Sequence, residues 1–192
     1  MRRQLQLEHL EKRNLLTALT MVRYFDTWDA GVIRSTDVAG ITFHPASGHL
    51  YLADSEISEL PEFFVGDNIF ATSLRGDQVF REIASNNHEP VGITYNQFDG
   101  YFYVVNDSTA SVARYDHGLN NPLAEILTSD GVSSAEDPEG ITSDPITGNL
   151  YVVDGKLGGR QVLVYNSNLE FLYRFSTAAE VTDGEGIGFD PV

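Results

Sequence analysis

The stretch Asp137-Pro-Glu-Gly-Ile-Thr-Ser-Asp-Pro-Ile-Thr-Gly-Asn-Leu-Tyr-Val-Val-Asp154 decides the fold, because its pattern recurs along the chain. Its first half, which contains a Gly-Ile pair, has copies that begin near residues 37, 89, 137 and 183, at intervals of roughly 46 to 52 residues. Its second half, which carries a tyrosine before a final Asp or Asn, follows the first three copies. A period of this length is typical of a repeat protein.

Each repeat unit predicts four short antiparallel strands, because alternating apolar residues are broken by Gly, Asn and Asp turns. The two halves of the quoted pattern form the first two strands. The other two strands are expected at 68–74 and 78–83, at 111–115 and 123–127, and at 161–165 and 171–175. Four strands per unit at this period favour an all-β fold, a β-propeller, over a sandwich or a parallel solenoid.

The repeat count predicts a partial or half propeller of about three complete blades. A single strand is expected at each end, from Met21 to Thr27 and from Gly186 to Asp190. Closed propellers have about four to eight blades. We therefore expect either a truncated sequence or two copies that pair as a homodimer and complete the ring, because exposed strand edges invite pairing.

Residues 1–20 differ from the repeats in residues 21–192, since they are rich in Leu, Arg, Lys and Glu and lack Gly and Pro. Leucines at helical spacing predict a short N-terminal helix, which forms a leader separate from the propeller blades.

Composition excludes several classes of function. The formal net charge is −16, with 28 acidic and 12 basic residues, so nucleic acid and anionic membrane surfaces are disfavoured and cations are favoured. There is no cysteine, which excludes disulfides and thiolate metal sites. The sequence contains no run of about 18 apolar residues, which a membrane-spanning helix would need, so we expect a soluble protein.

Acidic residues gather at one end of the predicted blades, because the loop before the first strand and the loop after the second strand emerge on the same face. An acidic residue three positions before the glycine occurs in every copy, which favours a structural role in the turn. Glu139 and Glu185 occur only in the later copies. A hard cation such as Ca²⁺ is bound by such oxygen ligands. The candidate metal ligands are Glu139, Glu185, Asp54, Asn106 and Asp154.

The first unit has a longer loop after its second strand, from Ser55 to Asp67, and insertions on one face of a repeat protein often bind partners. Its candidate binding residues are Glu56, Glu59, Glu62 and Asp67. Phe63 and Phe64 in the same loop are expected to pack it against the blade.

The repeat resembles blades of the NHL, gluconolactonase-like and phytase-like or SdiA-regulated propeller families, in which P-x-G-I and G-x-L-Y-V-x-D recur. In the gluconolactonase-like and phytase-like relatives acidic residues on this face hold metal, and the resemblance carries this role over only to Glu139, Glu185, Asp54, Asn106 and Asp154. The string from Leu7 to Ala18 resembles the LEPR-type leader of bacterial exported proteins, which implies an extracellular or cell-surface location; without it the protein would be a soluble cytoplasmic one.

Three functions follow from these features. The first is a cation-binding module, with calcium as the expected ion, that binds a metal or a small molecule on its acidic face. The second is a metal-dependent hydrolase of the phytase-like or lactonase-like type, with Glu139 or Glu185 as base or ligand. The third is a structural fragment without a site. The sequence leaves open whether the protein is an enzyme.

Overall fold

The computed structural model describes residues 24–28, 33–62, 64–85, 88–155, 160–177, 181 and 183–190. The expected helix and leader at residues 1–20 lie outside these ranges, so the boundary between the leader and the blades stays a prediction.

Within these described ranges, twelve strands form three four-stranded antiparallel sheets, which we call blades 1 to 3. Blade 1 contains β1 (Val38–His44), β2 (His49–Asp54), β3 (Ile69–Thr72) and β4 (Val79–Ile83). Blade 2 contains β5 (Pro90–Asn96), β6 (Tyr101–Asn106), β7 (Ser111–Tyr115) and β8 (Ala124–Leu127). Blade 3 contains β9 (Pro138–Ser143), β10 (Leu150–Asp154), β11 (Gln161–Tyr165) and β12 (Phe171–Ser176). Two 3₁₀ turns, η1 (Ile57–Glu59) and η2 (Thr128–Asp130), lie in loops.

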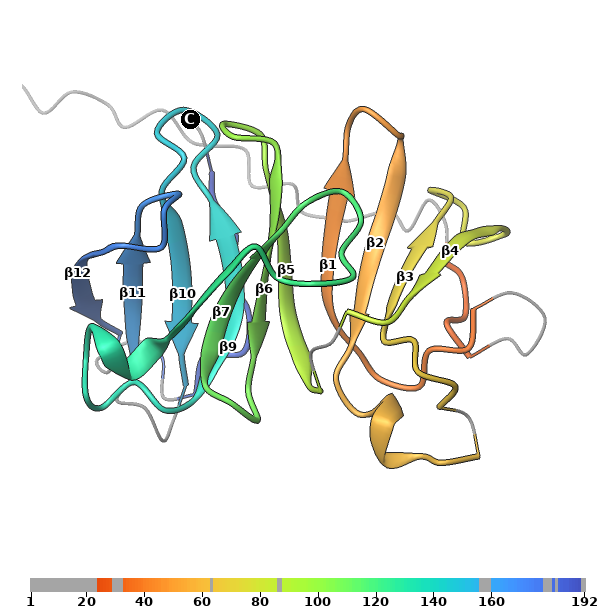
Figure 1. The fold of residues 1–192 in the computed structure, drawn as a ribbon, viewed down its shortest axis with the longest axis horizontal. Coiled ribbons are helices and arrows are strands. Elements are labelled where there is room, and N and C mark those ends of the chain that lie inside the picture. The colour runs from red at the N-terminus through yellow and green to blue at the C-terminus, as the bar shows by residue number, and fades with distance from the viewer. Residues whose placement is uncertain are drawn as a thin grey trace, which may run out of the picture.

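The strand order in each blade follows the chain, so each blade is a simple meander. The blades stand side by side, with β1, β5 and β9 adjacent and with β4 and β12 at the two far ends (Figure 1). This architecture is a partial β-propeller and confirms the predicted fold class. The outer strands begin and end within two residues of the predicted bounds.

Alternation along the strands builds the core between the blades. Tyr51 of β2 packs toward blade 2, whereas Phe102 of β6 packs back toward blade 1, and their rings lie 4.7 Å apart. One residue further on, Tyr103 faces blade 3 and packs in a cluster with Leu150. Because neighbouring residues of a strand point to opposite faces, β5, β6 and β7 of blade 2 each contribute to both interfaces. Tyr51 and Tyr103 thus pack between neighbouring blades.

Glycine in each first strand allows the inner strands to approach closely. A β-carbon added at Gly40 would lie 2.9 Å from the backbone nitrogen of Ile93. One added at Gly92 would lie 2.6 Å from the backbone oxygen of Glu139. Real β-carbons do not approach backbone atoms so closely, so the Gly-Ile pair of the repeat is a condition for packing one blade on the next.

Of the single strands predicted at the two ends, residues 21–23 of the first lie outside the described residues, and the described parts of both segments form no strand. Residues 24–28 contain a turn, in which Asp26 Oδ1 accepts a hydrogen bond from the backbone N–H of Trp28 at 2.9 Å. Such an aspartate turn competes with the extended conformation. Residues 184–190 belong to no strand, because no described segment pairs with them in a ladder.

Among the described residues, no helix combines the length and the apolar character needed to cross a membrane.

The close approach of the inner strands can be tested with Gly92→Ala. We expect a loss of about 1–3 kcal/mol in the free energy of unfolding, because the new methyl group meets backbone that cannot move aside cheaply. Urea unfolding measures it. The control is Gly188→Ala, whose β-carbon would meet nothing within 4 Å and which should leave stability nearly unchanged. Equal effects of the two substitutions would contradict the packing argument.

Candidate metal centre

Backbone hydrogen bonds hold together, at one end of each blade, the loop before the first strand and the loop after the second. In each blade the first residue after the second strand donates its N–H to the carbonyl of the acidic residue that opens the repeat. The bonds are Ser55 to Asp37 (3.1 Å), Asp107 to Glu89 (3.2 Å) and Gly155 to Asp137 (2.7 Å). The predicted convergence of these loops is therefore a consequence of the repeat backbone, and the recurrent acids serve the architecture through their main chain.

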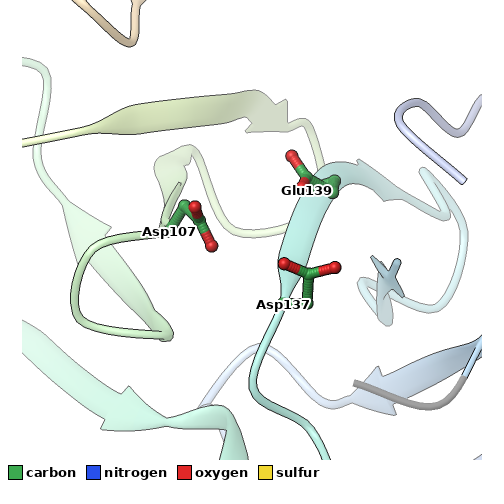
Figure 2. A group of neighbouring side chains, drawn as sticks. All are labelled: Asp107, Asp137 and Glu139. Carbon is green, nitrogen blue, oxygen red and sulfur yellow. The ribbon is translucent and has the colours of Figure 1, made fainter. Parts of the chain in front are cut away.

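Three carboxylates meet where blade 2 borders blade 3. Asp107 follows β6, Asp137 precedes β9, and Glu139 lies in β9. One ligand oxygen from each lies within 4.8 Å of the others, and all three residues are half-buried. Figure 2 shows Asp137 and Glu139 along one edge of β9, with Asp107 facing them from the neighbouring blade. We call Asp107, Asp137 and Glu139 the carboxylate cluster.

The cluster forms at this border because two positions of the repeat differ there. At the border between blades 1 and 2, Ser55 occupies the position of Asp107, and Val91 occupies the position of Glu139. The position that corresponds to Asp107 in blade 3 is Gly155, and a β-carbon there would lie 2.9 Å from Oδ2 of Asp137. Gly155 thus leaves room for the carboxylate of Asp137.

Burial and the surrounding negative charge raise the pKa of Glu139. Burial, followed by the charges of Glu185, Asp107, Asp137 and Asp183, raises the pKa of Glu139 from 4.5 to about 7. Each of these neighbours is itself a carboxylate. A cation at this place would relieve both the repulsion and the cost of burial. Glu185, the second glutamate singled out in the sequence, is exposed, and of these four carboxylates it has the largest effect on the pKa of Glu139.

The same crowding extends toward blade 1. Burial and then the charge of Asp137 raise the pKa of Asp107. Burial and then the charges of Asp107, Glu59 and Glu56 raise the pKa of Glu89. Glu56 and Glu59 of the first-blade loop therefore contribute to the raised pKa of Glu89 on the acidic face.

The three acids and amides at the ends of the second strands have a different environment. Asp54 is fully buried: its Oδ2 accepts from the backbone N–H of Thr36 at 2.6 Å, and its Oδ1 accepts from that of Ile57 at 2.9 Å. Asn106 is also buried, and its Oδ1 accepts from Ser108 Oγ at 2.8 Å. Both use these oxygens to hold their own loops.

Asp154 has the same position in blade 3 and is fully buried. Its Oδ1 accepts from the backbone N–H of Asp137 at 3.0 Å, and its Oδ2 accepts from Gln161 Nε2 at 2.7 Å. Burial raises its pKa. This hydrogen bond holds the backbone of Asp137, one of the three residues of the carboxylate cluster, in place.

The long loop of blade 1 lies along the border with blade 2. Ser58 Oγ donates to the backbone oxygen of His88 at 3.2 Å. Phe64 packs on the outer core of blade 1, as predicted, whereas Phe63 lies outside the described residues. Glu62 is exposed, and Asp67 lines a small hollow with Arg34.

Sequence reasoning singled out Glu139 but gave Asp137 a structural role and did not select Asp107 as a ligand. The signal lies in the column of the repeat that reads Ser55, Asp107 and Gly155. Asp107 is the one carboxylate at a repeat position that otherwise holds Ser55 and Gly155. Glu139, in the following unit, is likewise absent from the equivalent position of blade 2, which holds Val91. Together these two departures from the repeat mark the border between blades 2 and 3.

The raised pKa of Glu139 predicts a pH-dependent stability of the cation-free protein. Between about pH 4.5 and pH 7 the unfolded chain loses a proton that the folded chain keeps, so the free energy of unfolding should fall as the pH rises and then level off. Glu139→Gln should make this fall shallower, because the remaining raised carboxylates still contribute. Thermal unfolding in chelator from pH 5 to pH 8 measures it. The control is Glu82→Gln on the exposed face of β4, and an unchanged slope in Glu139→Gln would contradict the assignment.

The fold has counterparts among solved structures. Hydrazine synthase of Kuenenia stuttgartiensis is 20% identical with a TM-score of 0.57, and the match covers 82% of this chain and 41% of that chain. A chain of the nidogen/laminin complex is 19% identical with a TM-score of 0.54, and the match covers 82% of this chain and 52% of that one. The chain therefore spans about half or less of the length of these structures. No family model and no curated protein matches. At such identities the likeness supports the propeller-like fold alone.

Proposed function

We propose that this chain is a divalent-cation-binding module of an exported or cell-surface protein, built on a β-propeller-like scaffold, and that Ca²⁺ is its ion. The observation that carries the proposal is the carboxylate cluster at the border of blades 2 and 3. Its three ligand oxygens lie within 4.8 Å of one another on two blades.

The chemistry of the cluster fits calcium. Ca²⁺ takes about six to eight oxygen ligands at about 2.3–2.6 Å, so two oxygens on one ion can lie up to about 5 Å apart. Three carboxylates supply negative charge, and water can fill the remaining positions on an exposed face. Mg²⁺ requires a tighter octahedron at about 2.0–2.1 Å, which a cluster shared between two blades satisfies less well.

The exported location rests on the leader-like string from Leu7 to Ala18. Extracellular calcium modules bind at about 10⁻⁴–10⁻³ M, an affinity that three ligands with water can supply. An acidic, cation-loaded face suits a binding or interaction domain.

A second candidate is a metal-dependent hydrolase of the phytase-like or lactonase-like type, in which Glu139 or Glu185 would act as base or metal ligand. Burial and the neighbouring carboxylates raise the pKa of Glu139 to about 7 in the cation-free protein, and a bound cation would lower it again. Turnover of a phosphomonoester or a lactone with Ca²⁺ present separates the hydrolase from the binding module.

We expect Ca²⁺ to raise the thermal midpoint. At a free concentration ten times the Kd, a single site stabilises the native state by about 1.4 kcal/mol, which corresponds to about 3–5 °C in a domain of this size. Differential scanning calorimetry with Ca²⁺, Mg²⁺ and chelator measures the midpoint.

The repeat provides matched variants for this experiment. Asp107→Ser and Glu139→Val install the residues that stand at the same positions of the first border, Ser55 and Val91, and both should abolish the shift. Glu89→Gln is the control, because Glu89 is acidic and close by but lies outside the cluster. An unchanged midpoint of the parent protein across millimolar Ca²⁺ would reject the proposal.

A further inference from the structure

A histidine holds the turn between the first two strands of blade 1. His44 ends β1, and its Nδ1 lies 2.8 Å from Ser47 Oγ and 3.2 Å from the backbone nitrogen of Ser47. The same position of the repeat holds Asn96 in blade 2 and Asp144 in blade 3, and all three side chains are buried. Asn96 Oδ1 accepts a hydrogen bond from the backbone N–H of Phe98 at 3.1 Å. A side-chain acceptor therefore holds this turn in more than one blade.

The turn of blade 3 indicates how His44 is used. Asp144 Oδ1 accepts from the backbone N–H of Ile146 at 2.8 Å, and its Oδ2 accepts from Thr147 Oγ1 at 2.5 Å. Thr147 follows Asp144 by three residues, as Ser47 follows His44. Nδ1 of a neutral imidazole has a lone pair that can accept in the same way. We therefore assign Nδ1 of His44 as the acceptor of this turn.

A second proton on the ring of His44 conflicts with this arrangement. Both ring nitrogens of an imidazolium are donors, so Nδ1 can no longer accept from Ser47. Nε2 is buried and, within the described part of the chain, has no hydrogen-bond partner. Asn96, at the same position, instead donates from Nδ2 to the backbone oxygen of Gly148 in the next blade at 2.9 Å. Protonated His44 therefore loses one hydrogen bond and gains none.

The ring of His44 lies in the border between blades 1 and 2. Its centroid lies 6.0 Å from that of Tyr51 in β2, 4.4 Å from that of Tyr95 in β5 and 5.5 Å from that of Phe102 in β6. None of these rings carries a charge near neutral pH. The packing therefore removes water from His44 and supplies no counter-ion.

The charged groups around this border also oppose a second proton. The ring of His117, in the loop between β7 and β8, lies 5.2 Å from that of His44. Arg81 of β4 donates from Nη1 to the backbone oxygen of His117 at 2.8 Å, whereas Asp116 Oδ1 accepts a backbone N–H of its own loop at 2.7 Å. Burial, followed by the charges of His117 and His49, lowers the pKa of His44.

We propose that His44 is an acid-sensitive switch, whose protonation releases the turn between β1 and β2 and pushes the His117 loop of blade 2 away from blade 1. The sign follows from linkage, because an open border takes up a proton below about pH 6.5 that the closed border excludes, so acid favours opening. His44 ends its strand, whereas the carboxylate cluster lies where β9 begins. The switch is therefore separate from the proposed cation site.

Nuclear magnetic resonance of the labelled full chain in chelator tests the switch. Local signals are required, because protonation of Glu139 acts on overall stability in the opposite direction. The ring of His44 should titrate below pH 6.5. Exchange of the Ser47 amide with solvent, corrected for the intrinsic effect of pH, should become about fivefold faster from pH 7 to pH 5, as expected for one lost hydrogen bond.

Three variants locate the effect. His44→Asn installs the residue of blade 2, which accepts without titrating, so the acid response of Ser47 should disappear. His117→Gln removes one charge and should move the titration of His44 to higher pH. His88→Gln, at an exposed histidine elsewhere, is the control and should change neither signal.

Four results would overturn the switch. They are a titration of His44 at or above pH 6.5, equal exchange of Ser47 at both pH values, an acid response that persists in His44→Asn, and a titration of His44 that His117→Gln leaves in place. The first two are measured on the parent protein, so the outcome does not depend on the folding of a variant.

Discussion

The contact of glycine with the backbone of the neighbouring inner strand is the constraint on which the rest of the molecule depends. With a β-carbon at Gly92 only 2.6 Å from the backbone oxygen of Glu139, no other residue allows blades 2 and 3 to approach as they do. This approach brings the Tyr103 face of blade 2 onto Leu150 and buries both. The same approach sets the distance between Asp107 and the carboxylates of β9, so the packing of the core and the geometry of the acidic cluster share one cause.

Negative charge at the blade border opposes that packing. Glu139 lies in β9 between a buried proline and the contact glycine, so the packing of the blades fixes its backbone position. Its raised pKa reflects this conflict, since burial and four carboxylates act on it in the same direction. A proton or a bound cation removes the conflict in different ways. The proton neutralises one group, whereas a divalent cation interacts with all three carboxylates at once, which is why the cluster favours a cation at neutral pH.

The sequence was sufficient to predict the blades because every element of a blade depends on local signals. Alternation and the turn glycines Gly48, Gly100 and Gly148 with their positive φ angles determine backbone conformation within a few residues, and the Gly-Ile pair marks the first strand of every unit. The carboxylate cluster depends on a loop of one blade and a strand of the next, whose side-chain directions local patterns do not specify. The turn at Asp26 was missed for another reason, because a single side-chain hydrogen bond there competes with the extended conformation that the flanking residues favour.

Repetition separates architectural residues from chemical ones in this chain. Asp54 and Asp154 recur in equivalent positions, and hydrogen bonds from within their own blades occupy both oxygens of each, as expected for groups with a structural role. Asp107 and Glu139 depart from the residues at the same positions of the first border, and a blade folds without them, as the serine and valine there indicate. Two carboxylates that the fold does not require, brought together with a third at a cost in repulsion, need an explanation outside folding. The proposed binding of a cation supplies one, at the border where Asp107 and Glu139 replace the serine and the valine of the first border.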